Sequence, residues 1–290
     1  MKCLNSHWDF LIRIRKVLFG YPVQSSYDRY TVRLNSEHVL LKVKDFDAIK
    51  IGENLTFSAS KNSGVKQNTQ YDNDIYACLS ANPLLPMYNS EGGYYDYDDM
   101  MSEGYSWFLN NGNPIAAAAL SDHGLNLSKN YRLQASAYLQ IQPIKNLVFK
   151  SQFGYKYNSY SYRAYNKVSH LNQVSDVSKE SVSQNAGMGS SWTLDNTISY
   201  KFERNNHVLD AVIGQSLEKW GNGESLSGFA YNTLFSDSWD HAWLGNTKPT
   251  TINEVTISGY PDDEGALASF FGRANYNFKE TLYGVFYNKS

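Results

Sequence analysis

The chain has 290 residues, of which 26 are Lys or Arg and 28 are Asp or Glu, so its formal net charge is -2. This balance excludes the strong basic excess that is typical of nucleic-acid-binding proteins. The mean hydropathy is -0.49, and no apolar stretch is long enough to cross a bilayer as a helix. The unusual feature is the 23 Tyr residues. Tyr suits surfaces with one wet and one apolar side, such as membrane interfaces and sugar-binding platforms, and it is also common in all-β cores.

The first 16 residues hold an apolar patch that does not have the form of an export signal. Asp9, Arg13 and Arg15 interrupt it where a signal peptide needs an unbroken apolar run. At the other end, residues 284–290 stop within a strand-like pattern. We therefore expect the reading frame to be part of a longer gene.

A period-two alternation of apolar and polar residues dominates the chain and predicts strands with one apolar and one polar face. In several runs the apolar set begins or ends with Tyr, Trp or Phe, as in the aromatic girdles of membrane barrels. We predict about eight strands, and the clearest runs lie at 30–43, 49–59, 131–141, 147–158, 192–202, 207–217 and 270–279.

The connections between these runs alternate between short and very long. Short turns are expected near 44–47, 143–146, 203–206 and 279–280. Polar excursions separate the resulting hairpins, at about 62–129, 167–188 and 219–267. This asymmetry is typical of outer-membrane barrels, and the apolar runs match the ~9–11 residues that a tilted transmembrane strand needs. The sequence therefore favours an all-β, antiparallel transmembrane β-barrel, with short helices in its long loops at 73–85 and 113–120.

The long loops carry the candidate substrate-binding residues. Aromatic rings could stack on sugars, and carboxylates could accept hydrogen bonds from hydroxyl groups. The candidates are an acidic-aromatic run, Tyr94, Tyr95, Asp96, Tyr97, Asp98 and Asp99, and three Trp residues, Trp107, Trp239 and Trp243. The competing interpretation is that the run is a plain solvated loop and that the Trp side chains pack the loops together. A calcium ion is a further alternative, but the spacing of an EF-hand loop is missing.

No catalytic, phosphate-binding or metal-binding motif is present among the six scattered His residues, the two Cys residues or the Gly-containing turns. The sequence therefore predicts neither enzymatic activity nor a cofactor nor a metal site.

Six segments, taken in order, resemble the barrel of SusC/RagA-type TonB-linked outer-membrane transporters. They include an "NPLLP" turn, an "NPIA" helix, a "PIKNL" turn and an "FGRxNYxY" strand. The segments are 26–65, 74–89, 113–120, 131–158, 191–219 and 270–284. The resemblance makes 26–290 a partial TonB-dependent receptor barrel, and it leaves 1–25 as an unmatched N-terminal segment.

This resemblance implies a barrel of ~22 strands with a plugged lumen, located in the outer membrane and in contact with its lipid. The barrel would import a large nutrient, a glycan or a peptide oligomer, together with a SusD-like surface lipoprotein. Energy would come from the TonB complex through a plug region, and no plug region or TonB box is found in this sequence. No nucleic-acid partner is expected.

Two rivals stay open. A soluble or surface-exposed all-β carbohydrate-binding module would explain the aromatic residues without a membrane. A diffusion porin would need neither plug nor TonB. The transporter interpretation predicts that Leu139, Phe153, Ile198 and Tyr276 face lipid, and it places Arg273 in the lumen.

Overall fold

The computed structural model describes residues 6–18, 25–64, 74–104, 112–173, 176–279 and 282–289 of the chain. Most of them form one ten-stranded antiparallel sheet with the order β1-β2-β3-β4-β5-β8-β9-β11-β12, and β10 also pairs with β9. The strands are β1 (Ser6–Leu18), β2 (Ser26–Val43), β3 (Phe46–Ser63), β4 (Asn126–Ile144), β5 (Leu147–Asn166), β8 (Ser181–Arg204), β9 (His207–Tyr231), β10 (Val255–Pro261), β11 (Gly265–Phe278) and β12 (Leu282–Lys289).

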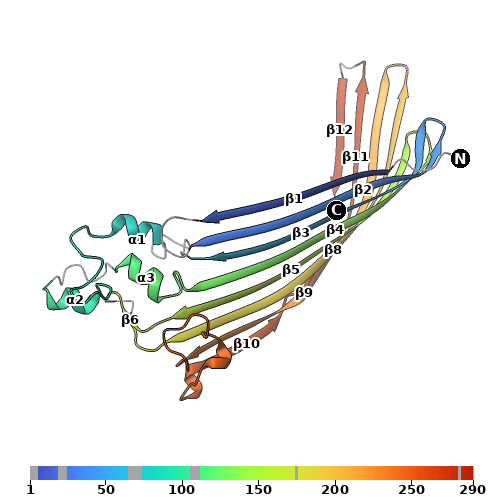
Figure 1. Ribbon diagram of the computed structural model, residues 1–290. Coiled ribbons are helices and arrows are strands. Elements are labelled where there is room, and N and C mark those ends of the chain that lie inside the picture. The colour runs from blue at the N-terminus through green and yellow to red at the C-terminus, as the bar shows by residue number, and fades with distance from the viewer. Residues whose placement is uncertain are drawn as a thin grey trace.

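The sheet is curved and open (Figure 1), and in the described part of the chain no pairing joins its edge strands β1 and β12. A single antiparallel sheet of this size whose edges do not meet is what part of a larger barrel looks like. The predicted fold class, a partial antiparallel barrel, is confirmed.

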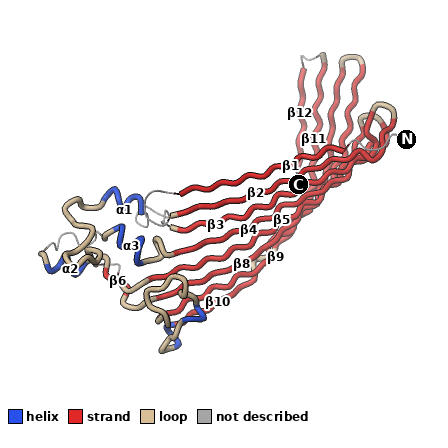
Figure 2. The backbone as a smooth tube through the Cα atoms, in the orientation of Figure 1, coloured by secondary structure: helices blue, strands red, loops and turns tan. Residues whose placement is uncertain are grey.

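The tight turns that join β2 to β3, β4 to β5 and β8 to β9 lie at one end of the sheet, and the helices and long loops lie at the other (Figure 2). Arg204 pairs with His207 across a two-residue turn, and Asn205 and Asn206 both have positive φ, of 47° and 68°. Asn tolerates this left-handed backbone better than most residues, and two positive φ values match the right-handed twist of the flanking strands. The turns predicted at 44–47, 143–146 and 203–206 are present, and the one predicted at 279–280 reaches beyond Lys279 into residues outside the described part of the chain. We call this side the turn end and the opposite side the loop end.

The loop end holds the remaining elements. The helices are α1 (Asp74–Ser80), α2 (Tyr97–Ser102) and α3 (Pro114–Leu120), and a small separate sheet joins β6 (Ser169–His170) to β7 (Asp176–Val177). Two 3-10 turns, η2 (Leu244–Asn246) and η3 (Ile252–Glu254), lie between β9 and β10. The helix predicted at 113–120 is present as α3, and Asn113 caps it by accepting from the N–H groups of Ile115 and Ala116. The helix predicted at 73–85 is present only in part, because α1 ends at Ser80 and the chain turns at 81–85. No helix in the described part of the chain is long and apolar enough to cross a membrane.

The strands are longer and more numerous than the sequence indicated. β8 has 24 residues and β9 has 25, well beyond the ~9–11 that cross a bilayer. Much of the polar excursion predicted at 219–267 is therefore strand, because β9 runs on to Tyr231 and β10 returns beside it. These strand extensions were not predicted because both of their faces carry polar side chains. A strand outside an apolar environment does not require alternating apolar and polar residues.

The N-terminal segment is part of the same sheet. β1 pairs with β2 over its whole length, from Ser6 opposite His38 to Leu18 opposite Ser26. The matched region begins only at residue 26, so the resemblance gave no sign of this strand. An alternation was present, with Phe10, Ile12 and Ile14 on one side, but Leu11 on the other side obscured it.

The register divides the sheet into two faces. Directly opposite residues of an antiparallel pair share a face, so the pairs Ala137–Phe153 and Phe153–Leu194 place these side chains together. Following the register puts Leu139, Phe153, Ile198 and Tyr276 on this one face, as predicted, and Arg273 on the other. The first face is apolar and open, with Phe153 47% and Ile213 61% exposed. We call it the outer face and the polar one the inner face.

The packed core of the described residues is small and lies at the loop end. Leu125, Tyr165, Val182 and Ala242 form it, with Trp239 and Leu244 packed against it. Over the rest of the sheet, no described residue outside the sheet covers the apolar side. An exposed apolar face of this extent requires an apolar surrounding.

Candidate functional site

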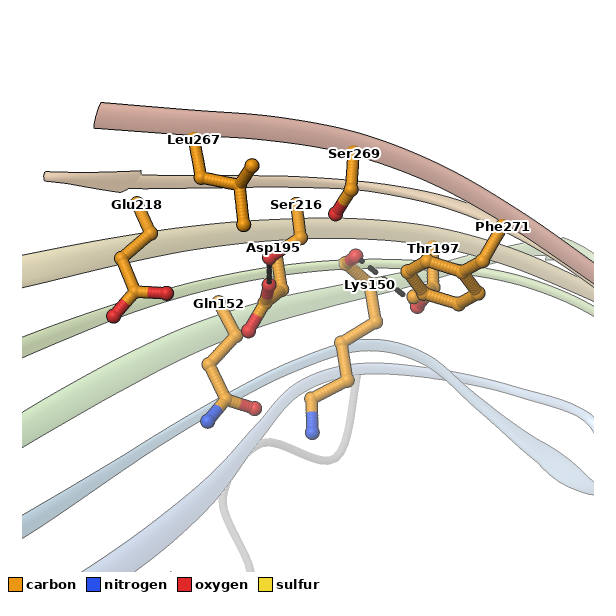
Figure 3. Close-up of a pocket in the computed structure, with 9 residues that line it drawn as sticks. All are labelled: Lys150, Gln152, Asp195, Thr197, Ser216, Glu218, Leu267, Ser269 and Phe271. Carbon is orange, nitrogen blue, oxygen red and sulfur yellow. Dashed lines mark hydrogen bonds between the residues drawn. The ribbon is translucent and has the colours of Figure 1, made fainter. Parts of the chain in front are cut away.

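The inner face carries a polar hollow across β5, β8, β9 and β11, with a volume of about 510 Å³. Figure 3 shows its side chains pointing into the concave side of the sheet, toward the N-terminal strands. The lining residues are Lys150, Gln152, Asp195, Thr197, Ser216, Glu218, Leu267, Ser269 and Phe271. Ser216 donates its hydroxyl hydrogen to Asp195 at 2.5 Å, and Lys150 Nζ lies 4.4 Å from the centroid of the Tyr138 ring. The head groups of Gln152 and Glu218 point into the hollow. A wall of this kind presents both charges and carboxamides to whatever fills the concave side.

Aromatic rings on the inner face lie flat against the wall. A Cβ at Gly52 would lie 2.3 Å from the Tyr138 ring, and one at Gly187 would lie 2.6 Å from the Tyr160 ring. These glycines sit directly opposite the aromatic residues on the neighbouring strand. Glycine is needed here because only a residue without a side chain lets the ring lie over the backbone. The arrangement keeps large side chains on the wall without closing the concave space.

The predicted acidic-aromatic run is not a loose loop, because part of it forms helix α2. Asp96 is the N-cap and accepts from the N–H groups of Asp98 and Asp99, while Asp99 accepts from the N–H of Asp96. This reciprocal pattern is a capping box. Tyr95 is only 2% exposed, and its hydroxyl donates to Glu103 at 2.8 Å. These side chains stabilise the loop, so their predicted role as ligand contacts stays a prediction.

The other members of the run lie nearer the surface. Tyr94 stacks on Tyr88 with ring centroids 5.5 Å apart. Tyr97 packs on the His170 ring at 4.2 Å, and the Asp98 carboxylate lies 3.3 Å from His170 Nδ1. This contact joins α2 to β6, two segments 72 residues apart. No group of three or more His, Cys, Asp or Glu side chains that could hold a metal occurs among the residues with assigned positions.

Two of the three predicted Trp residues clamp an arginine. The Arg163 guanidinium lies 4.0 Å from the ring centroids of both Trp239 and Trp243, and its Nη1 donates to the carbonyl of Ala242 at 3.2 Å. Arg163 is 8% exposed, so this cation is sandwiched with little water. Trp107 lies outside the described residues. No local pattern points to Arg163, because its partners are almost 80 residues away in the sequence.

The loop after β9 is held down by two carboxylates. Glu180 accepts from the Tyr165 hydroxyl at 2.9 Å and from the Asp237 N–H at 3.2 Å. Glu254 is 7% exposed and accepts from Lys179, from Asn232 Nδ2 at 2.8 Å and from the Thr250 N–H and hydroxyl. Residues 232–254 are thus fixed to the ends of β5, β8 and β9.

These contacts predict an acid-sensitive loop. Hydrogen bonds from Lys179, and then from Thr250, lower the pKa of Glu254 from its usual 4.5 to about 2. A depressed pKa means that the carboxylate stabilises the folded loop above pH 4.5 and that this contribution is lost as the pH falls to about 2. Hydrogen exchange of 232–254, corrected for its intrinsic rate, is expected to accelerate across this window. In the Glu254→Gln variant, residues 232–254 should exchange fast at all pH values in this window. The control is Glu91→Gln, in an exposed turn, which should behave like wild type. A Glu254→Gln profile identical to wild type would contradict the role of Glu254 in holding the loop.

The sequence and the fold were compared with those of known proteins. No family model matches the chain. The chain is 27% identical over 270 residues to "TonB-dependent receptor P26" of Formosa agariphila, covering 90% of this chain and 24% of that protein. It is similar to a structure of the RagAB peptide importer in its "open-open" state, with a TM-score of 0.69, 20% identity and coverage of 98% of this chain and 29% of that one. The "closed-closed" state gives a TM-score of 0.66 and 19% identity over 99% of this chain and 30% of that one.

In sequence and fold the chain is therefore similar to part of an outer-membrane β-barrel of the TonB-dependent receptor class. Within this class the fold is that of the SusC/RagA type, as the six ordered segments indicated. The chain spans less than a third of the length of these relatives. The outer face described above is the one that contacts membrane lipid, and the inner face lines the lumen.

Proposed function

We propose that this chain forms part of the wall of a transporter that imports a large nutrient, a glycan or peptide oligomer, without converting it chemically. The observation that supports the proposal is that one continuous sheet has an apolar outer face and a polar inner face. The outer face is apolar between Tyr131 and Ile141 on β4, and the same strand presents Arg132, Gln134 and Gln140 to the lumen. A polar lumen behind an apolar belt is the arrangement that a solute-conducting barrel needs.

The proposal also includes two protein partners of the transporter. A SusD-like surface lipoprotein would cover the loop end, and a TonB complex would supply energy through a plug region. Residues 26–290, with β1 added to them, act as one barrel unit. Among the predicted loop residues, Tyr94, Asp98 and Trp243 keep accessible surface and are proposed to contact the ligand, together with Tyr97.

A chimera tests this proposal. The matching segment of the Formosa agariphila receptor is replaced by residues 26–290, and import of fluorescent glycan and peptide oligomers is followed in cells with and without TonB. Import that requires TonB is expected. Import that continues without TonB would favour the diffusion porin, and a chain that stays water-soluble when produced with an export signal would favour the carbohydrate-binding module.

A further inference from the structure

Five cations gather on the inner face near the loop end of β1, β2, β4 and β5. We call this group the basic strip, and its members are Arg13, Arg29, Arg33, Arg132 and Lys156. All five side chains are exposed. β1 and β2 are neighbours, as are β4 and β5, and β3, which carries none of the five, lies between the two pairs, so the strip extends from β1 to β5.

The strand register places these cations in three adjacent rows. One row runs from Arg13 through Thr31 and Ser58 to Arg132, and the next runs from Arg33 through Thr56 and Gln134 to Lys156. The third row includes Arg29 and runs on through Ser60 and Asn130 to Tyr160 on β5. With neighbouring strands ~4.8 Å apart, the distance from β1 to β5 is about 19 Å. The strip is therefore too wide for a single small anion.

The cations of the strip are not neutralised within the part of the chain that the structure describes. No ion pair there involves any of the five, and the contact found is from Arg29 Nε to the Ser58 hydroxyl at 3.0 Å. The contrast with the turn end is clear, because Lys50 on the same face pairs with Glu37 at 2.9 Å. Cations without an ionic partner on the concave face raise the local concentration of anions there.

Groups that suit sugars lie between the cations. A hollow of about 400 Å³ is lined on the inner face by Arg132, Lys156, Gln134, Asn158 and Tyr160, together with Asn130. Carboxamides both donate and accept hydrogen bonds, as hydroxyl groups require. The Tyr160 ring lies over Gly187 and lines this hollow. Flat rings beside polar groups are suited to stacking on sugars.

We propose that the basic strip binds an anionic oligosaccharide, one that carries carboxylate or sulfate groups, on its way through the lumen. This inference rests on the proposed import function and names the class of its substrate. Arg and Lys supply charge-assisted hydrogen bonds to the anionic groups, and the carboxamides bind the hydroxyl groups between them. The multiple rows require an oligomer rather than a monosaccharide.

The test compares three probes of equal length on the chain in detergent micelles: sulfated dextran oligomer, unsulfated dextran oligomer and an oligo-glutamate peptide. The sulfated sugar is expected to bind at least about tenfold more tightly than the neutral one, with an affinity that falls as salt rises. Arg132→Gln and Lys156→Gln should each weaken its binding about tenfold.

Lys61→Gln and Lys129→Gln are the matched controls. Both remove one positive charge from an exposed residue at the loop end of β3 or β4, but on the outer face, and they should leave the affinity unchanged. Equal binding of the two dextrans, equal losses from inner and outer substitutions, or preference for the peptide would each overturn the inference. In the chimera, TonB-dependent import without preference for sulfated oligomers contradicts this inference alone, whereas loss of TonB dependence contradicts the proposed function.

Discussion

Phe153→Arg is expected to lower the free energy of unfolding in a bilayer by about 2–4 kcal/mol, because it puts a cation near the middle of the lipid-facing belt. Phe153 is 47% exposed on the outer face, with Ala137 and Leu194 opposite it on the neighbouring strands. Its ring also stacks on Trp192 at a centroid distance of 6.3 Å, and this contact would be lost. Urea titration of the chain folded into lipid vesicles measures the change.

Gln152→Arg supplies the control, since it introduces the same cation one residue earlier in the same strand. Gln152 points into the lumen, where Asp195 lies directly opposite and Glu218 lines the same hollow. This variant should remain within about 0.5 kcal/mol of wild type, as surface substitutions usually do. Equal destabilisation by the two substitutions would show that the two faces do not differ in their surroundings.

Arg163→Ala is expected to release the loop after β9 from the sheet. Each desolvated cation–π contact contributes about 2 kcal/mol, and Arg163 makes two of them, to Trp239 and Trp243. The local stability of residues 232–246 should therefore fall by about 2–4 kcal/mol. Native-state hydrogen exchange of that segment reports the loss directly.

A second variant distinguishes loss of the contacts between Arg163 and the two Trp rings from a general destabilisation of the fold. Arg163 Nε has no hydrogen-bond partner among the described residues, so the rings rather than hydrogen bonds supply most of its surroundings. Arg163→Lys keeps the positive charge but not the planar stacking, and it should recover part of the stability. Arg132→Ala, on the adjacent strand, should leave exchange in 232–246 unchanged. If residues 232–246 of the Arg163→Ala variant were as protected from hydrogen exchange as in wild type, Arg163 would not hold this loop.

The strands that cross the apolar belt could be predicted from the sequence because burial on one face enforces period-two alternation. Leu133, Ala135, Ala137 and Leu139 had to share a face, and the register confirms it. Asn205 and Asn206 marked a turn through their tolerance of positive φ. These local signals were sufficient for the fold class, the tight turns and the orientation of the strands that cross the belt.

Features beyond the belt depend on contacts between distant segments, and no local pattern encodes them. Trp239 and Trp243 were predicted as ligand contacts, and their association with Arg163 appears only when β5 and the loop meet. The capping role of Asp96 could have been inferred from Asp99 three positions later. The basic strip is dispersed over 13–156 in sequence, and the strand register is what brings its residues together.

Cysteine scanning along β4, from 131 to 141 in a background with Cys3 and Cys78 replaced by Ser, tests the central claim most directly. Each variant is inserted into vesicles and probed with a water-soluble thiol reagent and with a quencher attached to the lipid tails. Positions 133, 135, 137 and 139 are predicted to be quenched by lipid and protected from the reagent, and positions 132, 134, 136 and 138 to show the reverse. Labelling of both sets by the water-soluble reagent, with no quenching by lipid, would contradict a membrane-spanning wall.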